Sequence, residues 1–394
     1  MSTNNRWLLP EGVEELLPPE ARRLEALRRR IVDLFDTWGY DLVVPPLIEY
    51  LDSLLIGLGY DLDRQTFKLI DPLTGRLLGI RADITPQVAR IEAHRLRRMV
   101  PVRLCYLGPV LRTQPDAPGG LRNPLQVGIE LYGHAGIESD LEVMRLMVET
   151  LAVAGLINPY LDLGHVGIYR GLVAQSGLSH DAEAALFDAL QRKAVPELEA
   201  LLASLDLKTE LRTMLAALVR LHGGTEILKQ AKELLATADT EVKSALTNLR
   251  ALAEHLSIRL FNCPLHFDLG ELRGYAYHTG VVFAAYLPGH GRAVAQGGRY
   301  DGVGAVFGHP RPATGFSADL KALLFTAYPP KKSDGIYAPA LVDATLDARI
   351  HSLRAHGERV VQALPGQSGG PMEMDCSREL VWQLGEWNIC EIRS

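Results

Sequence analysis

The sequence predicts an α+β protein, built from an antiparallel sheet flanked by helices, a helical insertion and a small C-terminal α/β module. Three observations support this fold class. Strand-like runs lie on both sides of a stretch, about 178–257, whose Ala, Leu, Glu and Lys content and helical periodicity indicate helices. A proline-containing linker at 328–334 separates residues 1–327 from residues 333–394. Beyond that linker, strand and helix patterns alternate.

The bulk composition is that of an ordinary globular protein and argues against several classes of function. The chain has 394 residues and a formal net charge of −6, which gives no reason to expect a long phosphate-neutralising surface. The four cysteines form no CxxC pair, so neither a disulfide framework nor a metal site is expected. No apolar run reaches the length of a membrane span, and we expect a cytoplasmic protein that carries no cofactor.

The first element is an amphipathic helix over residues 19–38. Its apolar residues recur at three- and four-residue steps, and arginines occupy the other face. Residues 41–48 follow as a short strand that contains Pro45 and Pro46. Because proline cannot donate to a strand ladder, this strand is expected at a sheet edge or at a subunit boundary.

The remaining elements follow from the same patterns. A hairpin is expected at 67–80, turning at 71–75, where Asp, Pro, Thr and Gly cluster. Before the insertion we expect a helix at 86–98 and strands at 102–113 and 125–133, joined by the short irregular loop 115–120. Within 180–256 we expect four or five helices, with turns such as His222-Gly223-Gly224, and then strands at 265–269, 279–285 and 293–296. The C-terminal module reads as a strand at 335–341, a helix at 346–356, a strand at 359–364 and a second helix–strand pair ending at Ile392.

Polar side chains at strands or strand ends predict a pocket for a free amino acid. If Asp83, Thr85, Gln126 and Glu130 converge, they offer acceptors for an α-ammonium group and for a donor on the ligand's side chain. Arg273 then holds an α-carboxylate through its planar guanidinium. A free amino acid requires both kinds of contact. The glycine-rich run 297–302 fits neither the dinucleotide fingerprint nor the P-loop pattern.

Several segments together resemble class II aminoacyl-tRNA synthetases. Trp38-Gly39-Tyr40 followed by residues 45–49 resembles motif 1, residues 106–114 with 126–133 resemble motif 2, and residues 315–323 resemble motif 3. Within this class, residues 273–277 and 297–302 are similar to histidyl-tRNA synthetase, and the similarity covers roughly residues 6–325. The resemblance implies that histidine is bound by the residues at the matching positions, namely Asp83, Thr85, Gln126, Glu130, Arg273 and Tyr277. The second tyrosine of the family's pair is here His278.

Departures from the synthetase pattern argue against catalysis. The family places a motif 2 arginine and a motif 3 arginine on the ATP phosphates, and Arg112 matches only the first. At motif 3 the expected Glu-Arg pair is Lys321-Ala322, and Lys321 lacks the planar fork of arginine. The adenine-side glutamate of the family is Gln114. We therefore interpret Arg112 and Gln114 as a vestigial nucleotide site, and we expect no catalytic residue. Because the motif 2 loop and the C-terminal module are short, tRNA is not expected as a partner.

Residues 272–280 resemble the synthetase paralogue that serves as the regulatory subunit of ATP phosphoribosyltransferase. That resemblance implies a non-catalytic subunit that the short-form catalytic subunit requires for activity, with free histidine as the feedback inhibitor of the first step of histidine biosynthesis. It also implies a homodimer within a hetero-octamer. Two alternatives stay open. One is a divergent catalytic histidyl-tRNA synthetase, and the other is an RNA- or protein-binding module that kept the fold but not the ligand.

Overall fold

The structure, a computed structural model, describes residues 7–55, 60–115, 119–260, 262–275, 277–326 and 335–392. The chain forms two compact units, residues 1–327 and residues 328–394. The predicted linker at 328–334 lies outside the described residues. Among the described residues, no helix is both long and apolar enough to cross a membrane. The same residues contain no cluster of three His, Cys, Asp or Glu side chains arranged to hold a metal ion.

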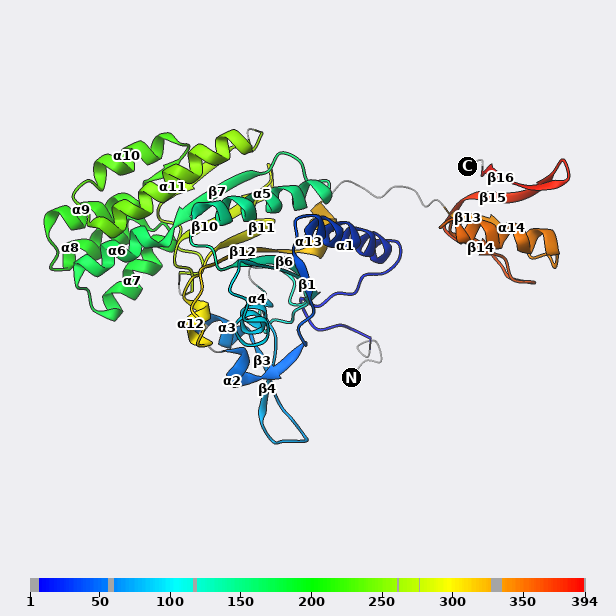
Figure 1. The fold of residues 1–394 in the computed structure, drawn as a ribbon, viewed down its shortest axis with the longest axis horizontal. Helices are drawn as coiled ribbons and strands as arrows, with labels where there is room; N and C mark the ends of the chain where they lie inside the picture. The colour runs from blue at the N-terminus through cyan, green and yellow to red at the C-terminus, as the bar shows by residue number, and fades with distance from the viewer. Residues whose placement is uncertain are drawn as a thin grey trace. The chain divides into compact units, whose positions relative to one another are not determined.

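A nine-stranded sheet organises the first unit, in the order β1-β5-β6-β12-β11-β10-β7-β9-β8 (Figure 1). Its central pairs are antiparallel, whereas β1 with β5 and β7 with β9 are parallel. The predicted α+β fold class is confirmed. The strands are β1 (Asp41–Val43), β5 (Val102–Pro109), β6 (Leu125–Tyr132), β7 (Tyr160–His165), β8 (His222–Gly223), β9 (Leu265–Asp268), β10 (Val281–Tyr286), β11 (Ala295–Arg299) and β12 (Ala313–Asp319).

Three helices form a layer with this sheet: α1 (Glu20–Thr37), α5 (Ile137–Val153) and α13 (Leu320–Thr326). Helix α1 matches the predicted amphipathic helix and buries Leu27, Ile31 and Phe35. The Phe35 ring meets Phe316 of β12 edge to face at 6.3 Å between centroids. The apolar stripe read from the sequence therefore fixes α1 against the strand that forms part of the pocket floor described below.

The region between α1 and β5 departs from the single strand predicted at 41–48. It contains two strands, β1 at the sheet edge and β2 (Ile48–Tyr50), with Pro45 and Pro46 between them. Both proline carbonyls accept from the buried guanidinium of Arg81. Strand β2 joins the predicted hairpin β3 (Phe67–Ile70) and β4 (Leu77–Ile80) in a three-stranded sheet. The helical elements here are α2 (Leu51–Leu54), α3 (Tyr60–Gln65), α4 (Thr85–Ile91) and a π-helical turn at Glu92–Leu96.

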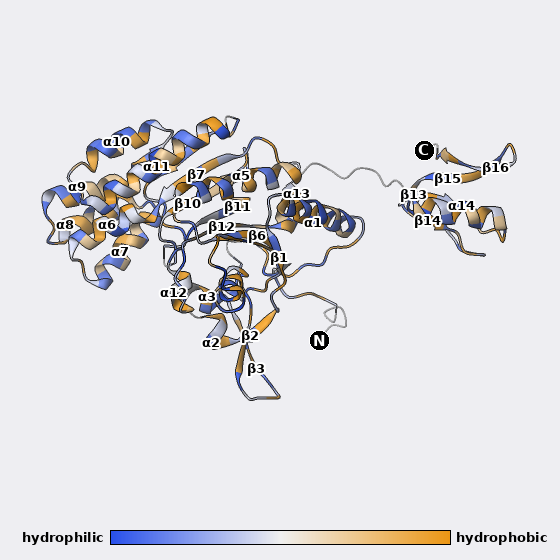
Figure 2. Cartoon of the chain, in the orientation of Figure 1, coloured by the Kyte–Doolittle hydropathy of each residue, from blue (hydrophilic) through white to orange (hydrophobic). Residues whose placement is uncertain are grey.

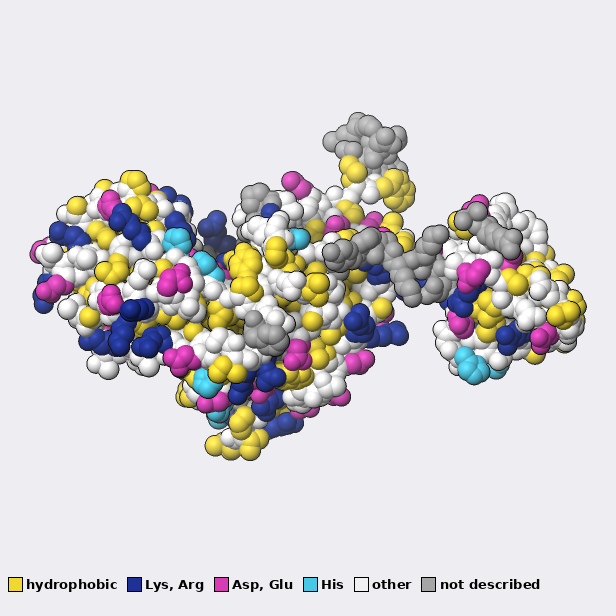
Figure 3. Space-filling model, turned by 90° about the horizontal axis from the view of Figure 1, so that it is seen from above, with side chains coloured by type: hydrophobic (Ala, Val, Ile, Leu, Met, Phe, Trp, Pro, Cys, Tyr) yellow, Lys and Arg dark blue, Asp and Glu magenta, His cyan; other side chains and the backbone are white. Residues whose placement is uncertain are grey.

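The predicted helical insertion forms five helices: α7 (His180–Gln191), α8 (Val195–Ser204), α9 (Thr209–Leu218), α10 (Glu226–Leu234) and α11 (Thr240–Arg259). Apolar stripes on these helices alternate with polar ones (Figure 2), and α6 (Val166–Ser176) packs against α11. The predicted turn at His222 is instead strand β8, which pairs with β9 at the sheet edge. On the face shown in Figure 3, acidic and basic side chains are intermixed over this helical region.

The C-terminal unit contains a four-stranded sheet in the order β14-β13-β15-β16. Strand β13 (Gly335–Ala338), helix α14 (Ala344–Ala355) and strand β14 (Val360–Gln362) match the predicted pattern. The predicted second helix–strand pair is wrong, because a hairpin of β15 (Cys376–Gln383) and β16 (Glu386–Glu391) stands there. Its turn places Leu384 and Gly385 at positive φ, so no helix forms.

Candidate functional site

A pocket lies over strands β6, β10, β11 and β12 and is closed by two loops. One loop precedes α4, and the other connects β9 to β10. Of the six residues predicted to bind histidine, five line this pocket: Asp83, Thr85, Glu130, Arg273 and Tyr277. The sequence motifs therefore converge in space, although only their types and order were visible in the chain. Ala276, within the second loop, lies outside the described residues.

Glu130 projects from β6 into the pocket base and is only 1% exposed. Its carboxylate accepts from the Tyr106 hydroxyl at 3.1 Å and from the Tyr300 hydroxyl. Burial raises the pKa of Glu130 to about 8, although the Tyr300 hydrogen bond favours the ionised form. The site thus holds an acid that is poised to change its charge near neutral pH when a cationic or donor group approaches.

Asp83 and Thr85 form the pocket wall at the start of α4, and Gln126 lies behind them. The amide of Gln126 donates to Asp83 Oδ1 at 3.1 Å, and its carbonyl oxygen accepts from the Ile84 backbone N–H at 2.9 Å. Asp83 Oδ1 also accepts from the Thr85 backbone N–H at 2.8 Å. Gln126 lines the adjoining cavity instead of the pocket itself. Its observed contacts therefore orient Asp83.

Arg273 lies across the pocket from these acids. Its Nη2 donates to the Tyr286 hydroxyl at 3.0 Å and to Glu271 Oε2 at 3.3 Å, and its Nη1 donates to Gln296 Oε1 at 3.4 Å. These contacts hold a partly exposed guanidinium in one orientation (37% exposed side chain). An arginine held in this way is suited to bidentate recognition of a carboxylate.

Tyr277 and His278 lie side by side, with ring centroids 4.1 Å apart. His278 also lines the pocket and is buried, and its Nδ1 lies 3.1 Å from the carbonyl oxygen of Arg273. Burial lowers the pKa of His278 to about 4, so the ring is neutral at pH 7. The residue that replaces the family's second tyrosine is therefore a neutral ring within the pocket wall.

The pocket also contains residues that the sequence motifs did not single out as ligands. They include Asp162 on β7, Glu271, Phe283 on β10, Tyr300 and Ser317. Asp162 Oδ1 lies 2.7 Å from Nδ1 of His266, which fixes its carboxylate at the pocket rim. A lone acid in the apolar strand Tyr160–His165 was the available signal for Asp162. Tyr300 was visible only as part of the glycine-rich run.

Glycines open the pocket floor where β11 and β12 pair. Gly298 lies opposite Gly315, and Gly315 lies opposite Glu130. A Cβ on Gly315 would lie 1.8 Å from Oε2 of Glu130, so no side chain fits there while that carboxylate keeps its place. These glycines are explained by the close approach of the Glu130 side chain and the neighbouring backbone.

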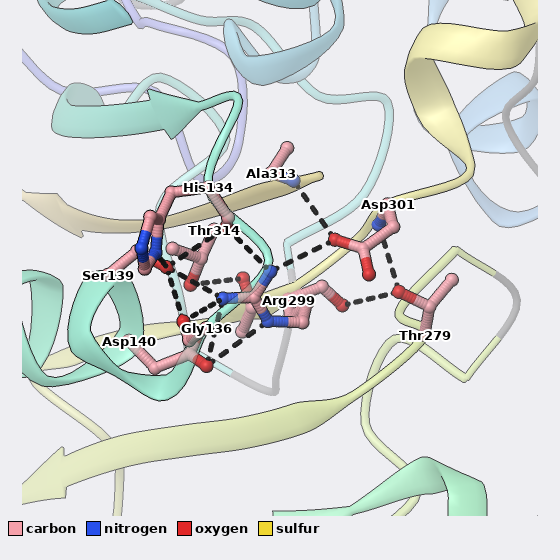
Figure 4. Close-up of polar contacts among 10 residues, drawn as sticks. His134, Gly136, Ser139, Asp140, Thr279, Arg299, Asp301, Ala313 and Thr314 are labelled. Atoms are coloured by element: carbon pink, nitrogen blue, oxygen red, sulfur yellow. Dashed lines mark hydrogen bonds and ion pairs between the residues drawn. The ribbon is translucent and has the colours of Figure 1, made fainter. Parts of the chain in front are cut away.

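Arg299, at the end of β11, ties the floor to the neighbouring helix (Figure 4). Its guanidinium donates to Asp140 Oδ2 at 3.0 Å, to Ser139 Oγ at 2.8 Å and to the backbone carbonyls of His134 and Gly136. Arg299 and Asp140 are both buried, and the arginine's many acceptors satisfy its donors. Within the glycine-rich run 297–302, Arg299 therefore has a structural role.

A second cavity adjoins the pocket and includes the position of the missing motif 3 arginine. It is lined by Arg112, Gln126, Asp319 and Ala322, among others. Arg112 thus faces it, whereas Gln114 is exposed and does not line it, and the vestigial nucleotide site stays a prediction. Lys321 points elsewhere, since its ammonium donates to the Glu14 carbonyl at 3.4 Å. Residues 116–118 of the short motif 2 loop lie outside the described residues.

Comparisons with known proteins agree with this architecture. The histidyl-tRNA synthetase family model matches residues 12–323, and the model for the C-terminal domain of the ATP phosphoribosyltransferase subunit HisZ matches residues 332–390. A solved ATP phosphoribosyltransferase regulatory subunit/histidyl-tRNA synthetase from Bacillus halodurans is 29% identical, with a TM-score of 0.81 over 94% of this chain and 96% of that chain. Histidyl-tRNA synthetase from Nostoc, at 18% identity and a TM-score of 0.77 over 95% of this chain and 91% of that chain, shares the fold.

The sheet, its helical insertion and the pocket define a protein of the histidyl-tRNA synthetase type. The curated relatives identify one family within this class. ATP phosphoribosyltransferase regulatory subunits from Alkalilimnicola ehrlichii (58% identical, over 96% of this chain and 95% of theirs) and from Thioalkalivibrio sulfidiphilus (56%, over 100% of both chains) match along their length. The chain belongs to the family of ATP phosphoribosyltransferase regulatory subunits. Members of this family are named as regulatory subunits and not as catalytic enzymes, and their role is in histidine biosynthesis.

Proposed function

We propose that this chain is the non-catalytic subunit that a short-form ATP phosphoribosyltransferase requires for activity, and that it confers feedback inhibition by histidine. The enzyme complex joins ATP to phosphoribosyl pyrophosphate, the first step of histidine biosynthesis. One observation carries the proposal: a pocket with acids on one side and an oriented arginine on the other adjoins a cavity that has alanine in place of a catalytic arginine. This combination favours binding of an amino acid without its activation.

Each group of histidine has a matching partner in the pocket. Asp83, oriented by Gln126, accepts from the α-ammonium group together with Thr85, and Arg273 donates to the α-carboxylate. Glu130 and Tyr277 face the imidazole. A ring N–H that donates to Glu130 favours the ionised carboxylate, which compensates for the burial of this acid.

The neighbouring cavity supports a non-catalytic role. Adenylate formation builds negative charge on the phosphates, and loss of one preorganised cationic donor typically costs about 3 kcal/mol of transition-state stabilisation. Ala322 supplies no charge, and the ammonium of Lys321 is held by the Glu14 carbonyl. A divergent histidyl-tRNA synthetase would show histidine-dependent exchange of pyrophosphate into ATP, and we expect none above background.

Regulation follows from differential binding. Histidine inhibits only if it binds one state of the complex more tightly than another, and a coupling of this kind is typically about 5- to 150-fold in affinity. We place the chain in a hetero-octamer of four chains of each type, with a homodimer of this chain as the building block.

The decisive experiment mixes the purified chain with a short-form ATP phosphoribosyltransferase and follows product formation with and without histidine. We expect activity that depends on this chain and falls when histidine is added. Failure to activate a catalytic partner that responds to its own regulatory chain would overturn the proposal and lead to the pyrophosphate-exchange assay. If calorimetry detects no histidine binding to the chain or to its complex, the chain is instead a binding module that kept only the fold.

A further inference from the structure

The loop between β9 and β10 has two sides with different contacts. One side presents Arg273, Tyr277 and His278 to the pocket. The other side presents Tyr275 to the helical region, away from the pocket lining. Because Tyr275 lies between Arg273 and Tyr277 in one short loop, we expect a displacement of Tyr275 to reach the residues that face the ligand.

Tyr275 is held by two helices outside the pocket. Its hydroxyl donates to Glu183 Oε1 of α7 at 3.1 Å, and its ring contacts Phe187 of α7 and Tyr169 of α6 at 5.4 and 5.3 Å between centroids. Arg170 of α6 adds a backbone clamp, because its Nη2 donates to the carbonyls of Tyr275 and His278 at 3.1 and 3.0 Å. The ligand-facing loop is therefore fastened at two points to α6 and α7.

Helix α7 also borders open space next to the pocket. A cavity separates it from the start of α4, lined on one side by His180, Ala184 and Phe187 and on the other by Asp83 and Pro86. The same cavity is lined by Arg273 and Tyr277, which also line the histidine pocket. Helix α7 thus faces open space where it approaches the pocket, and contacts the loop through Tyr275.

We infer that Tyr275 is a positioning residue, which couples occupancy of the histidine pocket to the helical insertion through its contact with Glu183 of α7. Histidine draws Arg273 and Tyr277 toward itself, and Tyr275 carries that displacement to α7. The position of the helical insertion then depends on whether histidine is bound, and the catalytic subunit responds to that position. This inference rests on the proposed function and adds the route by which the pocket acts.

The test uses the full-length chain, alone and in complex with the short-form catalytic subunit. Tyr275→Phe removes the donor of this hydrogen bond and Glu183→Ala removes its acceptor, and both keep the ring of residue 275 and its packing. Tyr169→Phe is the matched control, because its hydroxyl joins α6 to the Glu183 carbonyl of α7 at 3.2 Å and does not bond the loop. The measurements are histidine affinity by calorimetry, inhibition at saturating histidine, and hydrogen exchange of residues 180–191.

In the wild type and in Tyr169→Phe, we expect histidine to slow exchange in α7 and to inhibit the complex. In Tyr275→Phe and Glu183→Ala, the exchange response is lost and residual activity at saturating histidine rises about fivefold or more. Histidine affinity of the isolated variants changes by less than about threefold, and the double variant loses no more than either single one.

Three results would overturn the inference. They are full inhibition of Tyr275→Phe, an equal loss in Tyr169→Phe, or an affinity that falls in step with inhibition. A wild-type chain that binds no histidine would refute the proposed function itself, and the inference with it. The affinity measurement on the wild type therefore separates the two failures.

Discussion

The buried carboxyl group of Glu130 predicts a pH dependence of stability. Its pKa is about 8 in the folded chain, above the usual value of 4.5, so the folded state holds a proton that the unfolded state has lost. Stability is therefore lost as pH rises from about 4.5 to about 8, by on the order of 5 kcal/mol in total. We expect Glu130→Gln to remove this loss, as measured by urea unfolding at pH 6.5 and pH 8.5.

The pH range is chosen because His165 and His278, whose pKa values burial lowers to about 4, stay neutral in the fold there. These two histidines lower the stability of the folded state at more acidic pH, where they bind protons in the unfolded chain but stay neutral in the folded one. Equal pH slopes for the wild type and Glu130→Gln would contradict the assignment of this proton to Glu130.

Arg273 should determine the affinity of the pocket for a carboxylate. Hydrogen bonds to charged groups contribute roughly 1.5–3 kcal/mol, so Arg273→Glu is expected to weaken histidine binding by about 100-fold or more, because it also adds repulsion. Calorimetry of the isolated chain measures this directly. Arg292→Glu makes the same change in the adjoining cavity and should leave the affinity within about twofold. Unchanged histidine inhibition in Arg273→Glu would exclude the pocket.

Among the strands, the pairing of β12 with β6 makes Gly315 a floor position that is sensitive to substitution. Gly315→Ala places a methyl group 1.8 Å from Glu130 Oε2 and 2.5 Å from the Ile129 carbonyl oxygen. Glu130 must therefore move away from Tyr300, whose hydroxyl donates to Oε2, and the strand backbone must shift as well. We expect loss of histidine binding and destabilisation by roughly 1–3 kcal/mol, from calorimetry and thermal unfolding. Gly302→Ala is the control, because its nearest atom would be Thr279 Cγ2 at 3.8 Å. Histidine binding by Gly315→Ala comparable to that of Gly302→Ala would contradict this role.

The sequence predicted elements well wherever periodicity was sustained. Helix α1 and the hairpin β3–β4 follow directly from their patterns. The β15–β16 hairpin was missed because its turn has Leu384 at φ 55°, a position where Asn or Gly is the usual signal. Strand β8 was missed because two residues carry no period, and it forms only through pairing with β9.

The predicted site illustrates a different limit. The residue types indicated a pocket with acids and an arginine. Their spacing along the chain, however, does not show whether a given side chain points into the pocket or into the adjoining cavity. Gln126 proved to lie behind Asp83 rather than in the pocket, and Lys321 proved to bond the Glu14 carbonyl. Both positions are set by tertiary packing, so neither was available from the sequence.

Beyond single elements, the first unit presents a sheet edge that is suited to self-association. Strand β1 ends the sheet order, and the segment around it exposes Leu42, Val44, Leu47 and Ile48. Exposed apolar residues beside an open edge are typical of an interface. We expect Val44→Asp to convert a homodimer into a monomer, as measured by sedimentation. The control is Val342→Asp, a still more exposed valine of the C-terminal unit. A Val44→Asp chain that stays dimeric would locate the dimer interface elsewhere.

Replacement of the motif 3 arginine by Ala322 has a consequence for signalling as well as for chemistry. ATP is a substrate of the complex in the proposed function. A regulatory subunit that still bound the phosphates of ATP would therefore respond to ATP as well as to histidine. Ala322 faces the cavity and the ammonium group of Lys321 donates to the Glu14 carbonyl, so neither residue replaces the missing arginine as a phosphate ligand. We therefore expect histidine affinity to be insensitive to ATP. The regulatory subunit would then respond to the level of histidine and not to that of ATP, which acts on the complex only as a substrate.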